Sequence, residues 1–229
     1  MAQATLTVIG TATYSGTDYN LIWDDDNNGN SVIWLDYSNA PAIWSSQMAG
    51  AAGLDGQLTY NIDPAYTITW NDAAWRLPAT VDGPYVYSCD GTTSSGYNIT
   101  SSEMGHLYYA ELGNLGEYDS SCSSQAGYGL QNTGDFNNLH ESWYWSGTEF
   151  TAVPVPAAAW VFIMSQGGQV RYITTGTGTY GLAVRGGQVV VNDAIPTLNE
   201  WGLIVLSLFF LGLGYITIRK QNSYGESLN

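Results

Sequence analysis

The chain has 229 residues, with 20 acidic residues against five basic ones and a formal net charge of −15 at pH 7. Such a surface repels polyanions, which excludes nucleic acid as a partner. Because Arg219 and Lys220 lie in the tail, residues 1–194 contain only three Arg and no Lys. The 17 Tyr, 9 Trp and 27 Gly indicate one domain with bulky core side chains and many turns.

We expect the chain to begin with a strand over residues 1–14, in which Leu6, Val8 and Ile9 lie among threonines. Residues 1–5 lack the basic and apolar regions of a secretory leader, although Ala2-Gln3-Ala4 has the small-x-small form that precedes a signal-peptidase cut. Because the tail described below is typical of an exported protein, we expect a leader that this numbering lacks. The alternative is a plain N-terminal strand.

An acidic loop separates the next two predicted strands, Tyr19–Trp23 and Ser31–Tyr37. Calcium binds carboxylate and amide oxygens at alternating positions around a sharp turn. The loop therefore predicts a strand–loop–strand calcium site, with the candidate ligands Asp24, Asp26, Asn28, Asn30 and Asp36. It is not an EF-hand, because Leu35 stands at the twelfth position in place of Glu. The alternative is a solvated turn rich in Asp and Asn.

Two helices and further strands are expected downstream. The first helix covers Ala40–Ala52, with Pro41 in its first turn, and the second covers Ser101–Leu112, with Thr100 and Glu103 as a capping box. The remaining predicted strands are Leu58–Ile62, Tyr66–Trp70, Trp143–Phe150, Ala158–Met164, Gln169–Ile173, Tyr180–Arg185 and Gln188–Val191.

Cys89 and Cys122 are the only cysteines. Outside the cytoplasm we expect a disulfide between them that restrains a region rich in Ser and Gly, although its formation depends on a Cα separation that sequence does not give. Five tyrosines of these loops are candidates for contact with a glycan or a protein: Tyr85, Tyr87, Tyr97, Tyr118 and Tyr128. The alternative for each of them is packing within the loops.

Catalytic patterns are weak in this chain. There is no G-x-S-x-G elbow, and His106 and His140 are the only histidines. We therefore expect a protein that is not an enzyme. Arg76 and Arg185 are predicted to be structural and to pair with carboxylates such as Glu103 or Glu149.

The C-terminal segment, residues 193–229, has a distinctive order: Ile195, Pro196, Thr197 and Leu198, then Trp201, the uncharged run Gly202–Ile218, and finally Arg219 and Lys220. A helix over that run would be about 26 Å long, close to the ~30 Å hydrocarbon core of a bilayer. It predicts a hydrophobic helix that enters a membrane at least transiently; the alternative is a buried core helix. The segment resembles the IPTL-CTERM sorting signal of bacterial surface proteins. That resemblance implies an exported protein at the cell surface, and leaves open whether the segment is cleaved or kept as an anchor.

A second resemblance covers residues 15–192. Its ordered motifs are Trp75-Arg76-Leu77-Pro78, residues 102–109 (SEMGHLYY), Tyr144-Trp145-Ser146-Gly147 and residues 180–185 (YGLAVR). They are similar to the Lcl C-terminal-type domain of bacterial surface proteins, a domain of largely undefined function. The resemblance implies a compact α+β fold of C-type-lectin-like or sulfatase-modifying-factor-like shape, with two helices on antiparallel sheets. The namesake adhesin's domain binds sulfated polysaccharide, but the acidic surface argues against that ligand here unless calcium bridges the two.

Together these features predict a non-catalytic, exported cell-surface binding or adhesion module, stabilised by calcium, that contacts a glycan or a surface protein. The alternative is a structural subunit of an extracellular filament, surface layer or matrix. In that case the protein would form homo-oligomers, and the Thr-rich first strand would pair with a neighbouring subunit.

Overall fold

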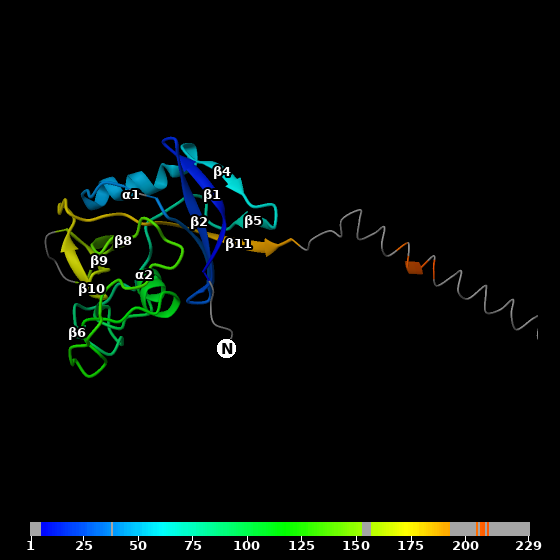
Figure 1. Cartoon of the computed structure of the whole chain (residues 1–229). Helices are drawn as coiled ribbons and strands as arrows, with labels where there is room; N and C mark the ends of the chain where they lie inside the picture. Colours follow the sequence, from blue (N-terminus) through cyan, green and yellow to red (C-terminus); the bar gives the residue numbers. More distant parts are fainter. Residues whose placement is uncertain are drawn as a thin grey trace, which may run out of the picture. The chain divides into compact units, whose positions relative to one another are not determined.

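The computed structural model describes residues 6–37, 39–152 and 157–192, together with Val205, Ser207, Leu208 and Phe210. The chain divides into a large unit, Met1–Val191, and a short C-terminal unit, Asn192–Asn229. Strands dominate the described part of the large unit (Figure 1).

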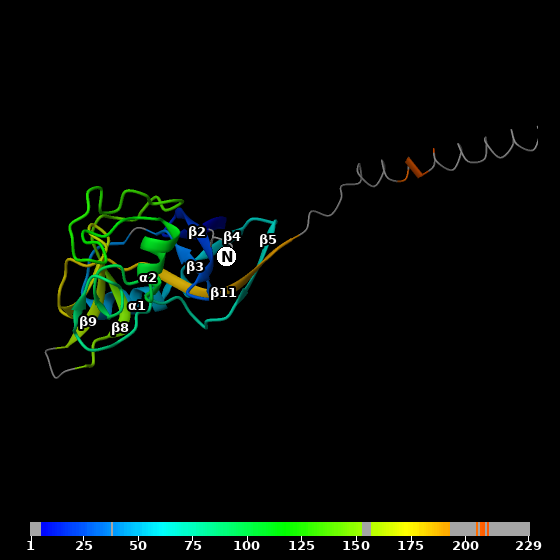
Figure 2. The ribbon, with the colours of Figure 1, turned by 90° about the horizontal axis from the view of Figure 1, so that it is seen from below.

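The first sheet is antiparallel throughout and contains both ends of the large unit's described chain. Its strands lie in the order β4 (Thr59–Ile62), β1 (Leu6–Tyr14), β2 (Thr17–Asn27), β3 (Asn30–Leu35), β11 (Ala183–Val191) and β5 (Tyr66–Trp70). Although β4 and β5 are its two outer strands, only residues 63–65 separate them in the chain, and the two views show them close together (Figures 1 and 2). The sheet is therefore strongly curled, which keeps its edges from offering a long open ladder.

The second sheet has the order β6 (Tyr87–Ser88), β7 (Ser95–Gly96), β10 (Gly168–Ile173), β9 (Ala158–Ile163) and β8 (Trp143–Glu149). Every residue of β9 is buried. Because side chains alternate along a strand, Phe162 joins a core cluster with Trp34 and Tyr108, while Val161 joins another with Ala51. Helical segments cover the two faces, which explains why β9 reads as a continuous apolar run.

The helical segments are shorter than the sequence predicts. Helix α1 (Trp44–Ala52) begins four residues later than expected, because Ala42 pairs with Thr179 and the backbone N–H of Trp44 donates to Thr174 O at 3.0 Å. Helix α2 (Glu103–His106) is a single turn and continues as the π-helical segment η2 (Leu107–Glu111). A short 3-10 turn, η1 (Leu54–Gly56), follows α1.

The predicted cap of the second helix is also wrong. Ser102, not Thr100, accepts the N-terminal hydrogen bond, from the backbone N–H of Gly105 at 3.1 Å. The carboxylate of Glu103 does not reach back to the helix start. It is occupied instead by Arg76, so a tertiary contact replaces the predicted capping box.

The predicted α+β fold, with two helices on antiparallel sheets and a C-terminal hydrophobic helix, is therefore wrong. The protein is mostly β: in the described residues 11 strands form two sheets, and α1, with nine residues, is the one α-helix longer than a turn. No helix in this part of the chain is long and apolar enough to cross a membrane. Most of the predicted span, Gly202–Ile218, lies outside the described residues. The implied C-type-lectin-like or sulfatase-modifying-factor-like shape is withdrawn with the α+β prediction.

Candidate functional site

The acidic loop is the end of the β2–β3 hairpin. Asn28 and Gly29 have φ values of 54° and 80°, the left-handed pair that a two-residue type I′ turn requires. The carboxylate of Asp26 accepts the backbone N–H of Gly29 at 2.9 Å, and Asn30 Nδ2 donates to the carbonyls of Asn27 and Asn28 at 3.4 and 3.2 Å. These polar groups therefore hold the turn itself.

The other two predicted calcium ligands lie away from the turn, Asp24 within β2 and Asp36 just after β3. Asp24 is fully buried, and its Oδ2 accepts from Asn27 Nδ2 at 2.8 Å and from Trp34 Nε1 at 3.1 Å. Asp36 follows the opposite end of β3, where it accepts the backbone N–H groups of Asn137 and Asn138 at 2.7 and 3.0 Å.

The structure thus brings four of the five predicted ligands into one hairpin and leaves Asp36 beyond its far end. Within the described ranges, no group of three or more His, Cys, Asp or Glu side chains has an arrangement that could hold a metal ion. Calcium binding stays a prediction.

A buried pair of carboxyl groups lies beside this hairpin. Asp24 Oδ1 and Glu111 Oε2 are both buried without a hydrogen-bond partner. The other oxygen of Glu111 lies 3.2 Å from His106 Nε2. Burial raises the pKa of the Glu111 carboxyl to about 7, and the charges of Asp24, Asp25 and Asp26 act in the same direction. Sequence gave no signal for this residue, because its burial depends on the packing of η2 against the hairpin.

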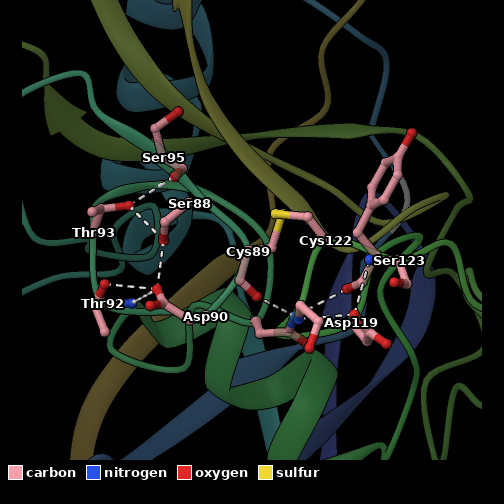
Figure 3. Close-up of a disulfide and its surroundings, with 12 residues drawn as sticks. Ser88, Cys89, Asp90, Thr92, Thr93, Ser95, Asp119, Cys122 and Ser123 are labelled. Atoms are coloured by element: carbon pink, nitrogen blue, oxygen red, sulfur yellow. Dashed lines mark hydrogen bonds between the residues drawn. A yellow bond between two sulfur atoms is a disulfide. The ribbon is translucent and has the colours of Figure 1, made fainter.

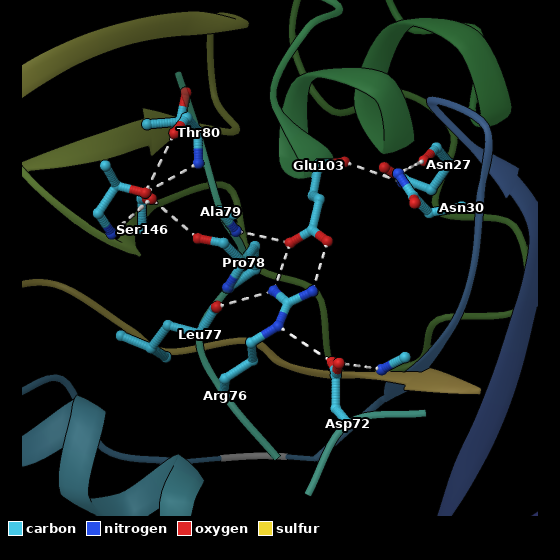
Figure 4. A network of polar contacts seen from close by, with 12 residues as sticks. Asn27, Asn30, Asp72, Arg76, Leu77, Pro78, Ala79, Thr80, Glu103 and Ser146 are labelled. Carbon is cyan, nitrogen blue, oxygen red and sulfur yellow. Dashed lines mark hydrogen bonds and ion pairs between the residues drawn. The ribbon is translucent and has the colours of Figure 1, made fainter. Parts of the chain in front are cut away.

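A polar pocket of about 320 Å³ opens between the first sheet and α2. At its base Arg76 forms two parallel hydrogen bonds with Glu103, Nη1 to Oε2 at 2.6 Å and Nη2 to Oε1 at 2.7 Å (Figure 4). The Arg76 Nε also donates to Asp72 at 3.3 Å. These contacts confirm the predicted Arg76–Glu103 pair, and hydrogen bonding to Glu103 raises the pKa of Arg76.

Arg185 also has a structural role, with a different partner from Glu149. Its Nη1 lies 2.5 Å from Asp55 Oδ1, and its guanidinium carbon lies 4.5 Å from the centre of the Trp70 ring. Two of the three arginines of the large unit are thus neutralised by carboxylates.

The loops between β6 and β8 are joined by the disulfide Cys89–Cys122, whose Cα atoms lie 5.3 Å apart (Figure 3). Asn98 Nδ2 strengthens the same junction by donating to the carbonyls of Cys89 at 2.6 Å and Tyr118 at 3.0 Å. The carboxylate of Asp90 accepts from Ser88 and Thr92, while Asp119 accepts two backbone N–H groups of its own loop. Short-range polar contacts and one covalent bond therefore fix a region with little regular structure.

The five predicted contact tyrosines fall into two groups. Tyr97 is buried and Tyr118 half-buried, with ring centres 5.1 Å apart, and Tyr97 Oη donates to Glu117 at 3.0 Å. For these two the alternative, packing within the loops, holds. Tyr85, Tyr87 and Tyr128 are 44%, 55% and 41% exposed.

Tyr85 lies beside a pocket that sequence reasoning missed. The pocket, about 270 Å³ in volume, is lined by Tyr85, Ala158, Arg171, Tyr172 and Ile173. Alternation along β10 places Arg171 and Ile173 on one face of the strand, which is the only sequence signal for this site. We call these five lining residues the arginine–tyrosine pocket.

A mostly β domain with a disulfide, followed by a separate C-terminal unit, is the organisation that the described geometry defines. Residues 193–220 match the IPTL-CTERM motif, which confirms the predicted sorting signal. The match indicates an exported protein that is directed to the cell surface through its C-terminus. Comparisons with curated proteins and with solved structures gave no match. The resemblance of residues 15–192 to the Lcl C-terminal-type domain is not shown by these comparisons and stays a prediction.

Proposed function

We propose that the exported domain is a non-catalytic binding or adhesion module whose contact surface is the loop containing Val81, Tyr85, Val86 and Tyr87. The observation that supports it most is the exposure of these four apolar side chains, from 44% to 55%, within seven residues. Exposed apolar patches of this kind mark interaction sites, and flat aromatic faces suit the apolar faces of sugar rings.

Rigidity of the loop supports the same function. The loop ends at the disulfide, and Tyr85 is held against Phe150 and Trp160, with ring centres 6.1 and 6.3 Å apart. A surface that is ordered before binding loses less conformational entropy when it captures a ligand. Glycan is the ligand class that this surface fits best.

The structural-subunit alternative relies on pairing through the Thr-rich first strand. Strand β1 lies between β4 and β2, and its residues Gly10–Thr13 are paired on both sides. Pairing of a neighbouring subunit with this part of β1 would require the sheet to open, so it gives that alternative no support.

A glycan array tests the proposal. The wild-type protein should retain specific glycans, and Tyr85→Ala and Tyr87→Ala should each reduce binding about tenfold. Val190→Ala is the matched control, because Val190 is 59% exposed on β11, outside the proposed surface. Equal binding by all four proteins, or binding to no glycan, would contradict the proposal.

A further inference from the structure

Arg171 differs from the other two arginines of the large unit. Arg76 and Arg185 each form an ion pair with a carboxylate. Across residues 6–37, 39–152 and 157–192, no carboxylate forms an ion pair with Arg171, and no hydrogen bond engages its guanidinium. Its guanidinium carbon lies instead over two rings, 4.7 Å from the centre of Tyr85 and 5.1 Å from that of Phe150.

The aromatic contacts orient the guanidinium without using its hydrogen-bond donors. A cation over a ring face interacts with the π-electrons, while the five N–H groups of Arg lie in the plane of the guanidinium. Among the described residues these donors have no hydrogen-bond partner, and Arg171 is one of the residues that line the arginine–tyrosine pocket, where they can serve a ligand. A carboxylate matches such a planar set of donors with two parallel hydrogen bonds.

Asp82, a carboxylate three residues before Tyr85 in the chain, is engaged elsewhere. Asp82 accepts Trp160 Nε1 at 2.9 Å with one oxygen and the hydroxyl of Thr151 at 2.5 Å with the other. Residues 153–156, which the structure does not describe, carry no charge. In a chain with a formal charge of −15, an arginine that pairs with no carboxylate of the described residues is unusual, and it identifies the point where a single negative charge would be accepted.

The rest of the pocket is apolar and aromatic. Ile173 is 49% exposed and Tyr85 44%, so both present faces to solvent beside the guanidinium. A cyclic ligand with one carboxylate would place that group on Arg171 and its C–H groups against the exposed parts of Tyr85 and Ile173. A polyanion would be repelled by the surrounding acidic surface, which favours one isolated negative charge.

Building on the proposed glycan-binding function, we propose that the arginine–tyrosine pocket binds a sugar residue that bears a single carboxylate. Arg171 pairs with the carboxylate, and the exposed parts of Tyr85 and Ile173 contact the sugar ring. The pocket thereby selects an acidic sugar over its neutral counterpart.

Titrations of the full chain with galacturonate and with galactose test this specificity, read by NMR shifts of the Trp indole N–H groups. Trp160 is a built-in reporter, because its ring lies 6.3 Å from that of Tyr85. Galacturonate should bind at least tenfold more tightly than galactose. Arg171→Gln should abolish that preference, Arg171→Lys should keep part of it, and Tyr85→Ala should weaken both sugars. The methyl ester of galacturonate should behave like galactose.

Three results would overturn the inference: equal affinity for the two sugars, no binding of either, or an Arg171→Gln variant that melts earlier but keeps the preference. The last result would show that Arg171 only stabilises the loop. The proposed function is judged separately on the glycan array. If array binding depends on Tyr85 but is unchanged in Arg171→Gln, this inference alone is wrong. If the wild-type protein binds no glycan on the array, both the inference and the proposed function are wrong.

Discussion

In the curled six-stranded sheet, turns of two or three residues join β1 to β2, β2 to β3 and β4 to β5, whereas the region from Asn71 to Ser142 forms only short strands, α2 and η2. The sheet is held by ladders of backbone hydrogen bonds, both between strands close in the chain, as in β1–β2 and β2–β3, and between distant ones, as in β11 with β3 and β5. The loop region is held by the disulfide, by side chains that bond to nearby backbone groups, and by Glu103, which binds Arg76, a residue whose backbone pairs with Val184 of β11. Ladders of backbone hydrogen bonds thus stabilise the sheet, whereas individual cross-links stabilise the loop region. The exposed aromatic loop belongs to the second.

The largest effect should follow from breaking the covalent cross-link. Replacing both Cys89 and Cys122 by Ser opens a loop of 33 residues of sequence separation and should lower the free energy of unfolding by about 3 to 4 kcal/mol. Urea denaturation measures the loss. In hydrogen exchange, amides of the loop region should become less protected, while those of the β1–β2 hairpin should keep their protection.

Wild-type protein under reducing conditions is the control for this double variant and should show the same loss. A change below about 1 kcal/mol, or exchange that rises equally in both regions, would show that the disulfide is not what fixes the loops.

The junction between the two regions should respond to pH through Glu111. Its pKa of about 7 lies above the usual value of 4.5, so the unfolded chain releases this proton first and folding stability falls as pH rises from about 4.5 to about 7. Glu111→Gln removes that fall. The variant should match the wild type at pH 4 and exceed it by about 2 kcal/mol at pH 8, after allowance for solvent screening.

Thermal denaturation across this pH range measures the difference between variant and wild type. Glu141→Gln, at an exposed position, is the control and should change stability little at any pH. A Glu111→Gln variant that is less stable than the wild type at pH 8 would show that the ionised carboxylate has a favourable partner.

The smallest effect should come from the turn that defines the regular region. At Gly29 φ is 80°, and an added Cβ would meet no atom within 4 Å, so Gly29→Ala costs only backbone strain, about 1 kcal/mol. Gly50→Ala is the matched control: it also adds a methyl group in open space, but within α1, where Ala is favoured by up to about 1 kcal/mol. Melting temperatures of the two variants should therefore move in opposite directions, and a shift of the same sign would contradict this explanation.

Sequence predicted the strands better than the helices. Tyr66–Trp70 was predicted with its observed bounds, and the other strands of four residues or more were placed within a few residues, because alternating or continuous apolar runs identify strands locally. One exception is β11, a continuous strand where two were predicted. Gly186 and Gly187 interrupt the apolar pattern, but long-range pairing with β3 and β5 carries the strand through them.

The helices were predicted less well, because their bounds depend on tertiary contacts and not on local pattern alone. Alanine-rich and capped segments favour helix locally, but short helices are only marginally stable without tertiary support. The backbone of Ala42 pairs with that of Thr179, so the helix begins after it. The carboxylate of Glu103 binds Arg76 and therefore does not cap the second helix.

By itself, the sequence determined the strand-rich hairpin region, the Asn28-Gly29 turn, the Arg76–Glu103 pair and the sorting motif at 193–220, because each depends on local pattern or on few charged partners. Only the tertiary structure decided which tyrosines are exposed, how Glu111 becomes a buried carboxyl and why Arg171 keeps its donors available. Those properties depend on which distant segments pack together and on how much water they exclude. Tyr85 and Arg171 are in contact only because folding brings the loop that contains Tyr85 beside strand β10.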